Sequence, residues 1–340
     1  MNELRLNGRL LVFDCHEAWV YQLRAVDRPL DIIVGLPGRA TSDWDTSMRP
    51  VPSKARCIRL PDVLAAREQY DCIIAHNLSD LLDVKSLPGP RMLVIHGTLG
   101  GMILDQQTAT PPDDLRRAVS QYVRMTGAHV MAVSHLKGRS WALDEDVVPL
   151  SADPADYPTH SGDIARGLRV ANQIRRKLRT LNWDFHEKTF AGLPLTLVGR
   201  NDEMPGVSPA RGWNDLKEIF RRHRFFVHTA EPSLEDGYNM ATLEAMAAGL
   251  PVLGNCHPTS PIRNGVNGFL SDDPAELRMF AWQLLRDSDL AIRLGFEARK
   301  TVTELFSTGK FKSGIERSIE TARKKWTEFH SSTFARHAEI

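Results

Sequence analysis

Short apolar runs alternate along the chain with charged segments of helical character. The runs are rich in Val, Ile and Leu, do not alternate with polar residues, and are bounded by turn residues or charged segments. Strands of a parallel sheet that helices cover on both faces have this composition. Between the runs lie helical segments such as Pro112–Thr126, which opens on Pro-Pro-Asp-Asp. In the first half the predicted strands are Arg9–Cys15, Leu30–Leu36, Cys57–Leu60, Asp71–Ala75, Met92–Ile95 and His129–Val133.

A polar stretch with two prolines, Ser151–Asp163, interrupts this rhythm and is typical of an interdomain linker. The rhythm then restarts, which predicts an α/β fold of two Rossmann-like, doubly wound domains facing a central cleft. Ligands of such sheets lie outside the carboxyl ends of the strands, so the cleft is the expected site. The predicted strands of the second half are Leu168–Ala171, Leu195–Val198, Phe225–His228, Pro251–Leu253 and Gly268–Leu270.

The predicted boundaries are residues 1–155 for the N-terminal domain, 156–312 for the C-terminal domain and 313–340 for a C-terminal helix. From about Lys310 onward, basic and apolar residues alternate at helical spacing. We expect this amphipathic helix to pack on the body of the protein rather than to dock on a membrane.

Composition narrows the class of protein. The chain has 340 residues, 42% of them hydrophobic and 25% charged, which fits a soluble globular protein of two domains. Because 43 Lys and Arg oppose 42 Asp and Glu, a general nucleic-acid binder is excluded. The sequence shows neither a secretion signal nor a membrane-spanning stretch, so a cytoplasmic location with at most peripheral membrane contact is expected.

The four cysteines form no Cys-x-x-Cys pair and have no metal-like spacing. Cys15, Cys57 and Cys72 lie in or beside apolar runs. They are therefore expected to be small buried residues in a reducing compartment, and no metal site is predicted from them.

The most informative segment is Phe225–Val252, which predicts a strand, a loop, a helix, a glycine stop and a further strand. Gly237 permits a tight turn at the end of the loop, and Gly249 ends the helix predicted over Asn239–Ala248. The helix start near Gly237–Met240 presents backbone N–H groups and the positive end of the helix dipole, so a diphosphate suits it.

Two carboxylates flank this helix start. Glu244 lies eight positions after Asp236, so one ligand can contact both, and vicinal hydroxyls of a ribose or a hexose suit carboxylate acceptors. In the alternative interpretation, Glu244 is a helix residue satisfied by a nearby Arg and Asp236 caps the loop. The residues alone leave both interpretations open.

The segment resembles the donor-site signature of the retaining GT-B glycosyltransferases of family four, the glycosyl transferases of group 1. That signature has two glutamates separated by seven residues. The first of these positions holds Asp236 here, with Glu235 beside it. The matching residues are Pro232-Ser233-Leu234-Glu235-Asp236-Gly237-Tyr238-Asn239 and Leu243-Glu244-Ala245-Met246-Ala247-Ala248-Gly249-Leu250-Pro251-Val252.

The resemblance extends to the phosphate-binding residues. Gly265-Val-Asn-Gly268 resembles the family's turn before the last strand, and Thr259 and Ser260 upstream of it offer hydroxyls to phosphate. The family's Lys position holds Lys177, whereas its Arg position, five residues earlier, holds Asn172. Arg176 and Arg200 are further candidate cations. The alternative for Arg175–Arg179 is a solvated helix face.

In the first domain, Tyr70–Asn77 and Val94–Gly101 resemble the family's strand ends that carry a histidine, here His76 and His96. A lone histidine beside an apolar strand is more often structural, and that alternative stays open. The chain departs from the family at the first strand, where Asp14–Trp19 replaces a Gly-rich loop.

The resemblance implies a hexosyl-type transferase that works with retention, without a metal and without a cofactor other than its nucleotide-sugar donor. It assigns Lys177, Arg176 and Arg200 to the diphosphate, Glu244 to the ribose, Asp236 to the sugar hydroxyls and His76 to the sugar pocket. Gly237, Tyr238, Asn239, Thr259, Ser260 and His96 complete the candidate donor site.

The acceptor (a sugar, a lipid-linked molecule or a small molecule), the donor sugar, the base and the oligomeric state stay unassigned. Two alternatives are a nucleotide-sugar epimerase or hydrolase of the same fold, and a non-catalytic relative that binds a nucleotide sugar.

Overall fold

A computed structural model describes residues 8–37 and 43–338, with side chains described as far as Ser331. The chain divides into two compact units. The first unit comprises Met1–Gly97, Ala109–Pro149 and Phe311–Ile340, and the second comprises Thr98–Thr108 and Leu150–Lys310. The chain therefore crosses between the units before residue 150, and its C-terminal helix groups with the first unit.

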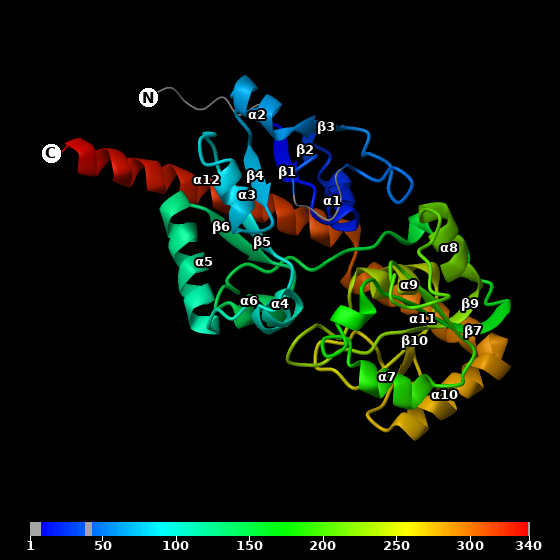
Figure 1. Cartoon of the computed structure of the whole chain (residues 1–340). Helices are drawn as coiled ribbons and strands as arrows, with labels where there is room; N and C mark the ends of the chain where they lie inside the picture. The colour runs from blue at the N-terminus through cyan, green and yellow to red at the C-terminus, as the bar shows by residue number, and fades with distance from the viewer. Residues whose placement is uncertain (1–7, 38–42, 339–340) are drawn as a thin grey trace. The chain divides into compact units, whose positions relative to one another are not determined.

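The first unit contains a six-stranded parallel sheet of order β3-β2-β1-β4-β5-β6 (Figure 1). All six predicted strands of the first half are present, with bounds within two residues of those expected. The strands are β1 (Leu10–Phe13), β2 (Leu30–Val34), β3 (Ala55–Arg59), β4 (Cys72–Ala75), β5 (Arg91–Ile95) and β6 (His129–Ala132).

Helices cover both faces of this sheet. One face buries Leu11, Phe13 and Ile73 against Val63 of α2 (Leu60–Ala66). On the other, Trp19 contacts Phe311 of α12, the C-terminal helix, at a ring-centroid distance of 6.0 Å. The remaining helices of this unit are α1 (Glu17–Gln22), η1 (Leu23–Val26), α3 (Leu78–Asp83), α5 (Pro112–Thr126), α6 (His135–Ser140) and α12 (Thr308–Ala338).

Helix α12 packs along the first unit as its amphipathic pattern predicts. Ile315, Ile319 and Trp326 are buried, and Figure 1 shows the helix beside the strands of this unit. Among the described residues, none of the helices combines the length and the apolarity needed to cross a bilayer.

The second unit contains a five-stranded parallel sheet of order β11-β10-β9-β7-β8. All five predicted strands of the second half are present, so the prediction of two doubly wound α/β domains is confirmed. The strands are β7 (Ile164–Val170), β8 (Leu195–Val198), β9 (His223–Val227), β10 (Val252–Gly254) and β11 (Gly268–Leu270).

Alternate residues along β9 face opposite layers of helices. Phe225 and Val227 pack in a cluster with Leu277 and Leu284 of α10, whereas Phe226 meets Phe220 of α8 at a centroid distance of 6.1 Å. The helices of this unit are α4 (Leu99–Gln106), η2 (Pro154–Asp156), η3 (Ile174–Arg176), α7 (Trp183–Phe190), α8 (Trp213–Arg222), α9 (Met240–Ala248), α10 (Pro274–Arg286) and α11 (Ser288–Leu305).

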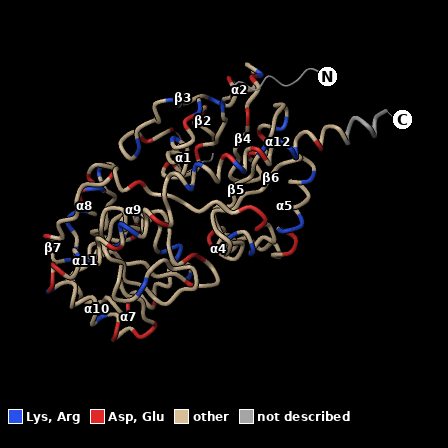
Figure 2. Tube along the Cα trace, turned by 180° about the vertical axis from the view of Figure 1, so that it is seen from behind, with Lys and Arg blue, Asp and Glu red and all other residues tan. Residues whose placement is uncertain are grey.

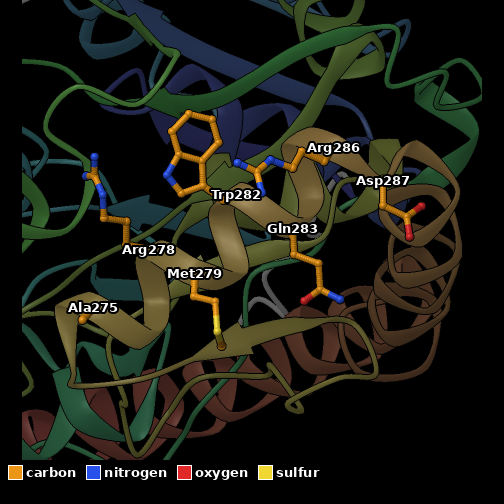
Figure 3. Close-up of a pocket in the computed structure, with 7 residues that line it drawn as sticks. All are labelled: Ala275, Arg278, Met279, Trp282, Gln283, Arg286 and Asp287. Atoms are coloured by element: carbon orange, nitrogen blue, oxygen red, sulfur yellow. The ribbon is translucent and has the colours of Figure 1, made fainter.

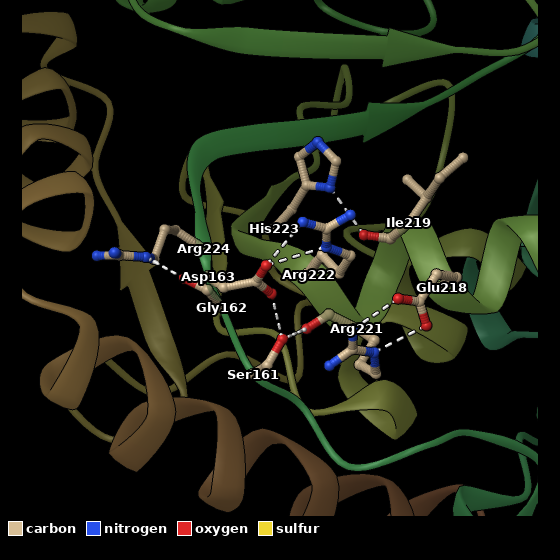
Figure 4. Close-up of polar contacts among 9 residues, drawn as sticks. All are labelled: Ser161, Gly162, Asp163, Glu218, Ile219, Arg221, Arg222, His223 and Arg224. Atoms are coloured by element: carbon tan, nitrogen blue, oxygen red, sulfur yellow. Dashed lines mark hydrogen bonds and ion pairs between the residues drawn. The ribbon is translucent and has the colours of Figure 1, made fainter.

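The predicted linker ends in a firm attachment to the second unit (Figure 4). Ser161 donates its backbone N–H to the carbonyl of Arg221 at 2.9 Å. Arg222 donates to Asp163 from Nε at 3.0 Å and from Nη2 at 2.8 Å, and Arg224 donates to the carbonyl of Gly162. These bonds fix the entry of β7 to the junction between α8 and β9.

One expectation about the cysteines is wrong. Cys72 is buried, but Cys15 is only half-buried and Cys57 is exposed. The reason for Cys57 is topological, because β3 is an edge strand with mostly exposed positions. Figure 2 marks Lys and Arg in blue and Asp and Glu in red along the Cα trace, and both colours are interspersed along each unit, in line with the small net charge.

Candidate functional site

The loop after β9, residues 228–239, is held in place by its own second unit. The amide of Asn255, at the end of β10, exchanges two hydrogen bonds with the backbone of Ala230, each 3.0 Å long. His257 contacts the carbonyl of Glu235 through Nε2 at 2.9 Å and accepts the backbone N–H of Thr259 at Nδ1 at 3.1 Å. The loop is therefore shaped by hydrogen bonds before any ligand binds.

Gly237 lies where this loop packs against the segment that follows β10. Its N–H donates to the hydroxyl of Thr259 at 2.8 Å. A Cβ on Gly237 would lie 2.8 Å from His257 Cβ and from the backbone N of Ser260. Only glycine fits this approach, which explains the glycine that the signature carries here.

Helix α9 begins one residue later than the sequence predicts, because Asn239 is its N-cap. The Asn239 side chain accepts the N–H of Thr242 at 2.9 Å, and Gly249 ends the helix at φ 92°. Tyr238 packs its ring on Phe306 at 5.0 Å. The side chains of Asn239 and Tyr238 thus shape the start of this helix, where the positive end of the helix dipole lies.

Asp236 and Glu244 lie on either side of this helix start, and both are almost wholly buried, with 1% and 6% exposure. Glu244 is the one charged residue on α9, every other described residue of which is apolar or Thr. His228, beneath the loop, contacts the carbonyl of Asp236 through Nε2 at 3.1 Å. Burial lowers the pKa of His228 to about 4, so its imidazole is neutral at pH 7.

The candidate cations lie on the loops after β7 and β8. Asn172 accepts the N–H of Arg200 at 2.9 Å, and Asn201 accepts the N–H of Ile174 at 2.8 Å. The segment from Ile174 to Arg176 is a short 3-10 turn rather than an α-helix, and Arg175, Arg176 and Arg179 are exposed. The role of these cations on a diphosphate therefore stays a prediction beside the alternative of a solvated surface.

Residues Thr98–Thr108 belong to the second unit, although the residues before and after them in the sequence belong to the first. This segment contacts the donor loop. Thr98 donates from its hydroxyl to the carbonyl of Leu234, and a Cβ on Gly101 would lie 2.9 Å from that carbonyl oxygen. Near the end of α4, Asp105 accepts a hydrogen bond from the Thr180 hydroxyl at 3.5 Å and lies within electrostatic reach of Lys177, Arg176 and Glu235. Burial raises the pKa of Asp105, and Lys177 opposes that shift. Lys177 and Arg176, together with Glu235 of the donor loop, thus act on the same carboxylate.

Beneath these loops lies a buried arginine that the sequence analysis does not single out. Arg169 on β7 donates to the carbonyls of Leu181 and Thr229 at 3.2 and 3.3 Å and to the Thr229 hydroxyl at 2.7 Å. It also contacts His186 Nδ1 at 2.9 Å. Burial lowers the pKa of Arg169 to about 9, which still leaves it charged at pH 7. Arg169 joins the donor loop to the segment that carries Lys177.

In the first unit, His76 and His96 follow directly after β4 and β5. Their Nδ1 and Nε2 atoms lie 2.8 Å apart, and Trp19 contacts both rings edge-on at centroid distances of 5.2 Å. Burial, together with His76, His16 and Lys137, lowers the pKa of His96 well below its usual value. The structure thus brings the two predicted histidines together.

Cys15 joins this pair and was missed as a site residue. One ligand atom from each of Cys15, His76 and His96 lies within 4.8 Å of the others. The preceding residue, Asp14, is buried, and burial raises its pKa to about 6. Three parallel strands that each end in Cys or His are the sequence signal that could have revealed the cluster.

The outer face of α10 carries a groove lined by Arg278, Met279, Trp282 and Arg286, among others (Figure 3). Arg286 lies over the ring of Trp282 at 5.3 Å. None of the predicted site residues lines this groove.

Comparison with known proteins finds a family match over the part of the chain that contains the donor loop. Residues 189–287 match the family model described as glycosyl transferases group 1. A curated sucrose synthase from Melioribacter roseus is 36% identical over 98 residues. That match covers 26% of this chain and spans only 12% of the length of the relative.

Solved structures resemble the whole chain. HepE from Anabaena, in complex with UDP and glucose, matches with a TM-score of 0.67 and 14% identity over 93% of this chain and 100% of its own. Sucrose-phosphate synthase from Thermosynechococcus elongatus matches with a TM-score of 0.61 and 15% identity over 97% of this chain and 100% of its own. The chain therefore has the GT-B fold, and its residues 189–287 match the model of the glycosyl transferases group 1 family.

Proposed function

We propose that this protein transfers a sugar from a nucleoside-diphosphate donor to an acceptor hydroxyl, with retention of configuration at the anomeric carbon. The observation that carries the proposal is the pair Asp236 and Glu244, both buried, on either side of a capped helix start. Because HepE is described in complex with UDP and with UDP-glucose, a uridine donor is the first to test.

The proposed roles follow from the family resemblance. Glu244 accepts hydrogen bonds from the ribose, and Asp236 accepts them from the sugar hydroxyls. The diphosphate lies at the start of α9, near Gly237 and Ser260. Lys177, Arg176 and Arg200 supply the positive charge that it needs.

Thr259 takes a different role from the one that the resemblance suggests. Its hydroxyl accepts the Gly237 N–H and lies 3.2 Å from His257 Nδ1. We assign it to shaping the loop rather than to binding phosphate.

In the proposed reaction the bond between the anomeric carbon and the β-phosphate oxygen breaks, and its electron pair stays on the phosphate. The acceptor oxygen forms its bond to the anomeric carbon on the same face, and its proton passes to the leaving phosphate oxygen. The cations and the helix-start amides stabilise the developing negative charge. No divalent cation and no cofactor has a role in this scheme.

His76 keeps its proposed contact with the donor sugar on the strength of the family resemblance, and His96 keeps its place as a further donor-site candidate. The acceptor stays unassigned, and a cytoplasmic location stays a prediction.

The test combines binding with product analysis. UDP and UDP-glucose are titrated into the wild type, Glu244→Gln and the control Glu218→Gln, which changes a half-exposed carboxylate on α8. Loss of a charged hydrogen bond to ribose is worth about 1.5–3 kcal/mol, so Glu244→Gln should bind roughly ten- to a hundredfold more weakly. Glu218→Gln should bind like the wild type, and equal affinity of all three proteins would refute the assignment.

Product analysis distinguishes the possible reactions. Proton couplings measured by NMR should show a product with the donor's anomeric configuration, and added Mg²⁺ or Mn²⁺ should not raise the rate. Turnover of donor alone would indicate an epimerase or hydrolase. Tight binding without turnover across a broad acceptor panel would indicate a nucleotide-sugar-binding relative.

A further inference from the structure

Three neighbouring strands of the first sheet each deliver one metal-ligating side chain to the same edge. His76 follows the last residue of β4, His96 follows the last residue of β5, and Cys15 lies two residues after the end of β1. The sheet order places β4 between β1 and β5. The ligands are therefore positioned by hydrogen-bonded strands rather than by one flexible loop.

The spacing of the three groups suits a single metal ion. Their ligand atoms lie within 4.8 Å of one another, and the two imidazole nitrogens are 2.8 Å apart. In a tetrahedral zinc site, with Zn–N about 2.0–2.1 Å and Zn–S about 2.3 Å, ligand atoms are about 3.3–3.6 Å apart. That value falls inside the observed range, so small side-chain rotations suffice to form the site.

The rings are already turned toward one another. Their centroids are 4.9 Å apart with an interplanar angle of 45°. Trp19, buried to 1% exposure, stands nearly perpendicular to both rings, at 83° and 88°. This buried indole restricts both imidazoles to orientations close to the observed ones, which lowers the entropy lost on binding a metal.

The ligand types select the metal. A thiolate with two imidazoles is a borderline-soft set that suits zinc, whereas magnesium and calcium require oxygen ligands. Three protein ligands also leave a tetrahedral ion one open position, as in catalytic rather than structural zinc sites. Without metal, the two histidines share a hydrogen bond, and one ring nitrogen must give up its proton when the ion enters.

We propose that Cys15, His76 and His96 bind one zinc(II) ion at the carboxyl edge of the first sheet, with water in the fourth position. The His76 ligand is Nδ1, the His96 ligand is Nε2 and the Cys15 ligand is the thiolate. This site goes beyond the proposed glycosyl transfer and does not depend on it. It assigns His76 and His96 to the metal in place of the donor contacts that the family resemblance gave them, and its test measures the metal and not turnover.

The test uses the full chain stripped of metal with a chelator and then dialysed. Zinc(II) is titrated against a chromophoric chelator, and cobalt(II) replaces it for spectroscopy. The wild type should bind one equivalent and show a thiolate-to-cobalt charge-transfer band in the near ultraviolet. X-ray absorption at the zinc edge should give one sulfur and two imidazole ligands.

Variants identify the ligands. Cys15→Ser should lose the charge-transfer band, and Cys15→Ser, His76→Asn and His96→Asn should each bind zinc more than about a hundredfold more weakly, since changes in the outer shell alone cost about 10- to 100-fold. Cys57→Ser is the matched control, because Cys57 is an exposed cysteine of the same unit. It should retain both the band and the wild-type affinity.

A second measurement avoids any folding defect in the variants. In the wild type, zinc(II) should protect Cys15 from alkylation, read by mass spectrometry, and leave Cys57 reactive. The proposal is overturned if the wild type binds no stoichiometric zinc. It is equally overturned if Cys15→Ser binds zinc with wild-type affinity, or if zinc leaves the alkylation of Cys15 unchanged.

Discussion

At the edge of the second sheet, one continuous loop and the helix after it supply most of the candidate donor site. At the edge of the first sheet, three separate strand ends supply one side chain each. In the second unit, His257, Thr259 and Asn255 fix the loop through hydrogen bonds to its backbone. In the first unit, Trp19 restricts the side chains of His76 and His96.

The difference shows what each kind of site requires. A backbone-lined anion site needs a particular chain path, so glycines and capping residues must stand at fixed spacing along the sequence. A side-chain cluster needs only that strands end side by side, so its residues can lie far apart in the sequence. The first kind is visible in a sequence motif, and the second becomes visible when the strand order is known.

The largest expected effect concerns the buried link beneath the donor loop. Arg169→Met removes the donors to Thr229 O and His186 Nδ1, while Leu181 O keeps the Thr229 hydroxyl at 2.7 Å. Each buried group left without a partner costs about 1–3 kcal/mol, so we expect the free energy of unfolding to fall by about 4 kcal/mol. Urea denaturation measures it.

The control for this variant is Arg166→Met, on the same strand but exposed. It should change the free energy of unfolding by less than about 0.5 kcal/mol. If both variants unfold alike, the donor loop does not depend on the buried guanidinium, and the contrast between the two sheet edges loses its main support.

The second effect is a loss of stability in acid. Burial lowers the pKa of His228 from its usual 6.5 to about 4 in the folded chain. Between these values the unfolded chain binds the proton more readily, so stability falls as the pH drops from about 6.5 toward 4. The full difference is worth roughly 3 kcal/mol, at 1.36 kcal/mol per pKa unit.

His228→Gln keeps an amide donor for the carbonyl of Asp236 but does not titrate in this range. We therefore expect the free energy of unfolding of this variant to decline by roughly 3 kcal/mol less than that of the wild type between pH 7 and pH 4. Urea denaturation across this range provides the comparison. Parallel curves for the two proteins would show that His228 is not held neutral in the folded state.

A structural feature could be predicted from the sequence where the residues that form it are close together along the chain. Apolar runs located every strand, because a strand buried in a parallel sheet needs apolar side chains on both faces. Arg169 was hidden inside one such run, since its partners Leu181 and Thr229 come from other segments. Cys15 was hidden for the same reason, because the residues beside it are brought there by β4 and β5.

The third prediction compares two glycines directly. Gly237→Ala places a Cβ 2.8 Å from His257 and Ser260, whereas a Cβ on Gly97, just after His96, meets nothing within 4 Å. Overpacking costs about 1–3 kcal/mol, so Gly237→Ala should weaken UDP binding by roughly tenfold. Gly97→Ala should leave both stability and UDP affinity unchanged. Calorimetric titration of both variants with UDP tests this comparison. Equal affinities for UDP would mean that the donor loop adapts to an added Cβ as readily as the chain at Gly97 does.

The smallest effect concerns the hydrogen bond that holds Gly237. Thr259→Val keeps the shape of the side chain but removes the hydroxyl that accepts the Gly237 N–H at 2.8 Å. A single neutral hydrogen bond is worth about 1 kcal/mol, so UDP affinity should fall by roughly fivefold, and Thr259→Ser should restore it.

A direct contact between Thr259 and phosphate would give the same change in affinity. Hydrogen exchange without ligand separates the two roles, because only a loop-shaping hydroxyl protects the Gly237 amide in the free protein. Faster exchange of that amide in Thr259→Val, with wild-type exchange in Thr259→Ser, is the result that we expect. Unchanged exchange of the Gly237 amide together with weakened UDP binding would return Thr259 to the set of phosphate ligands. The donor loop would then depend on its bound ligand for its shape.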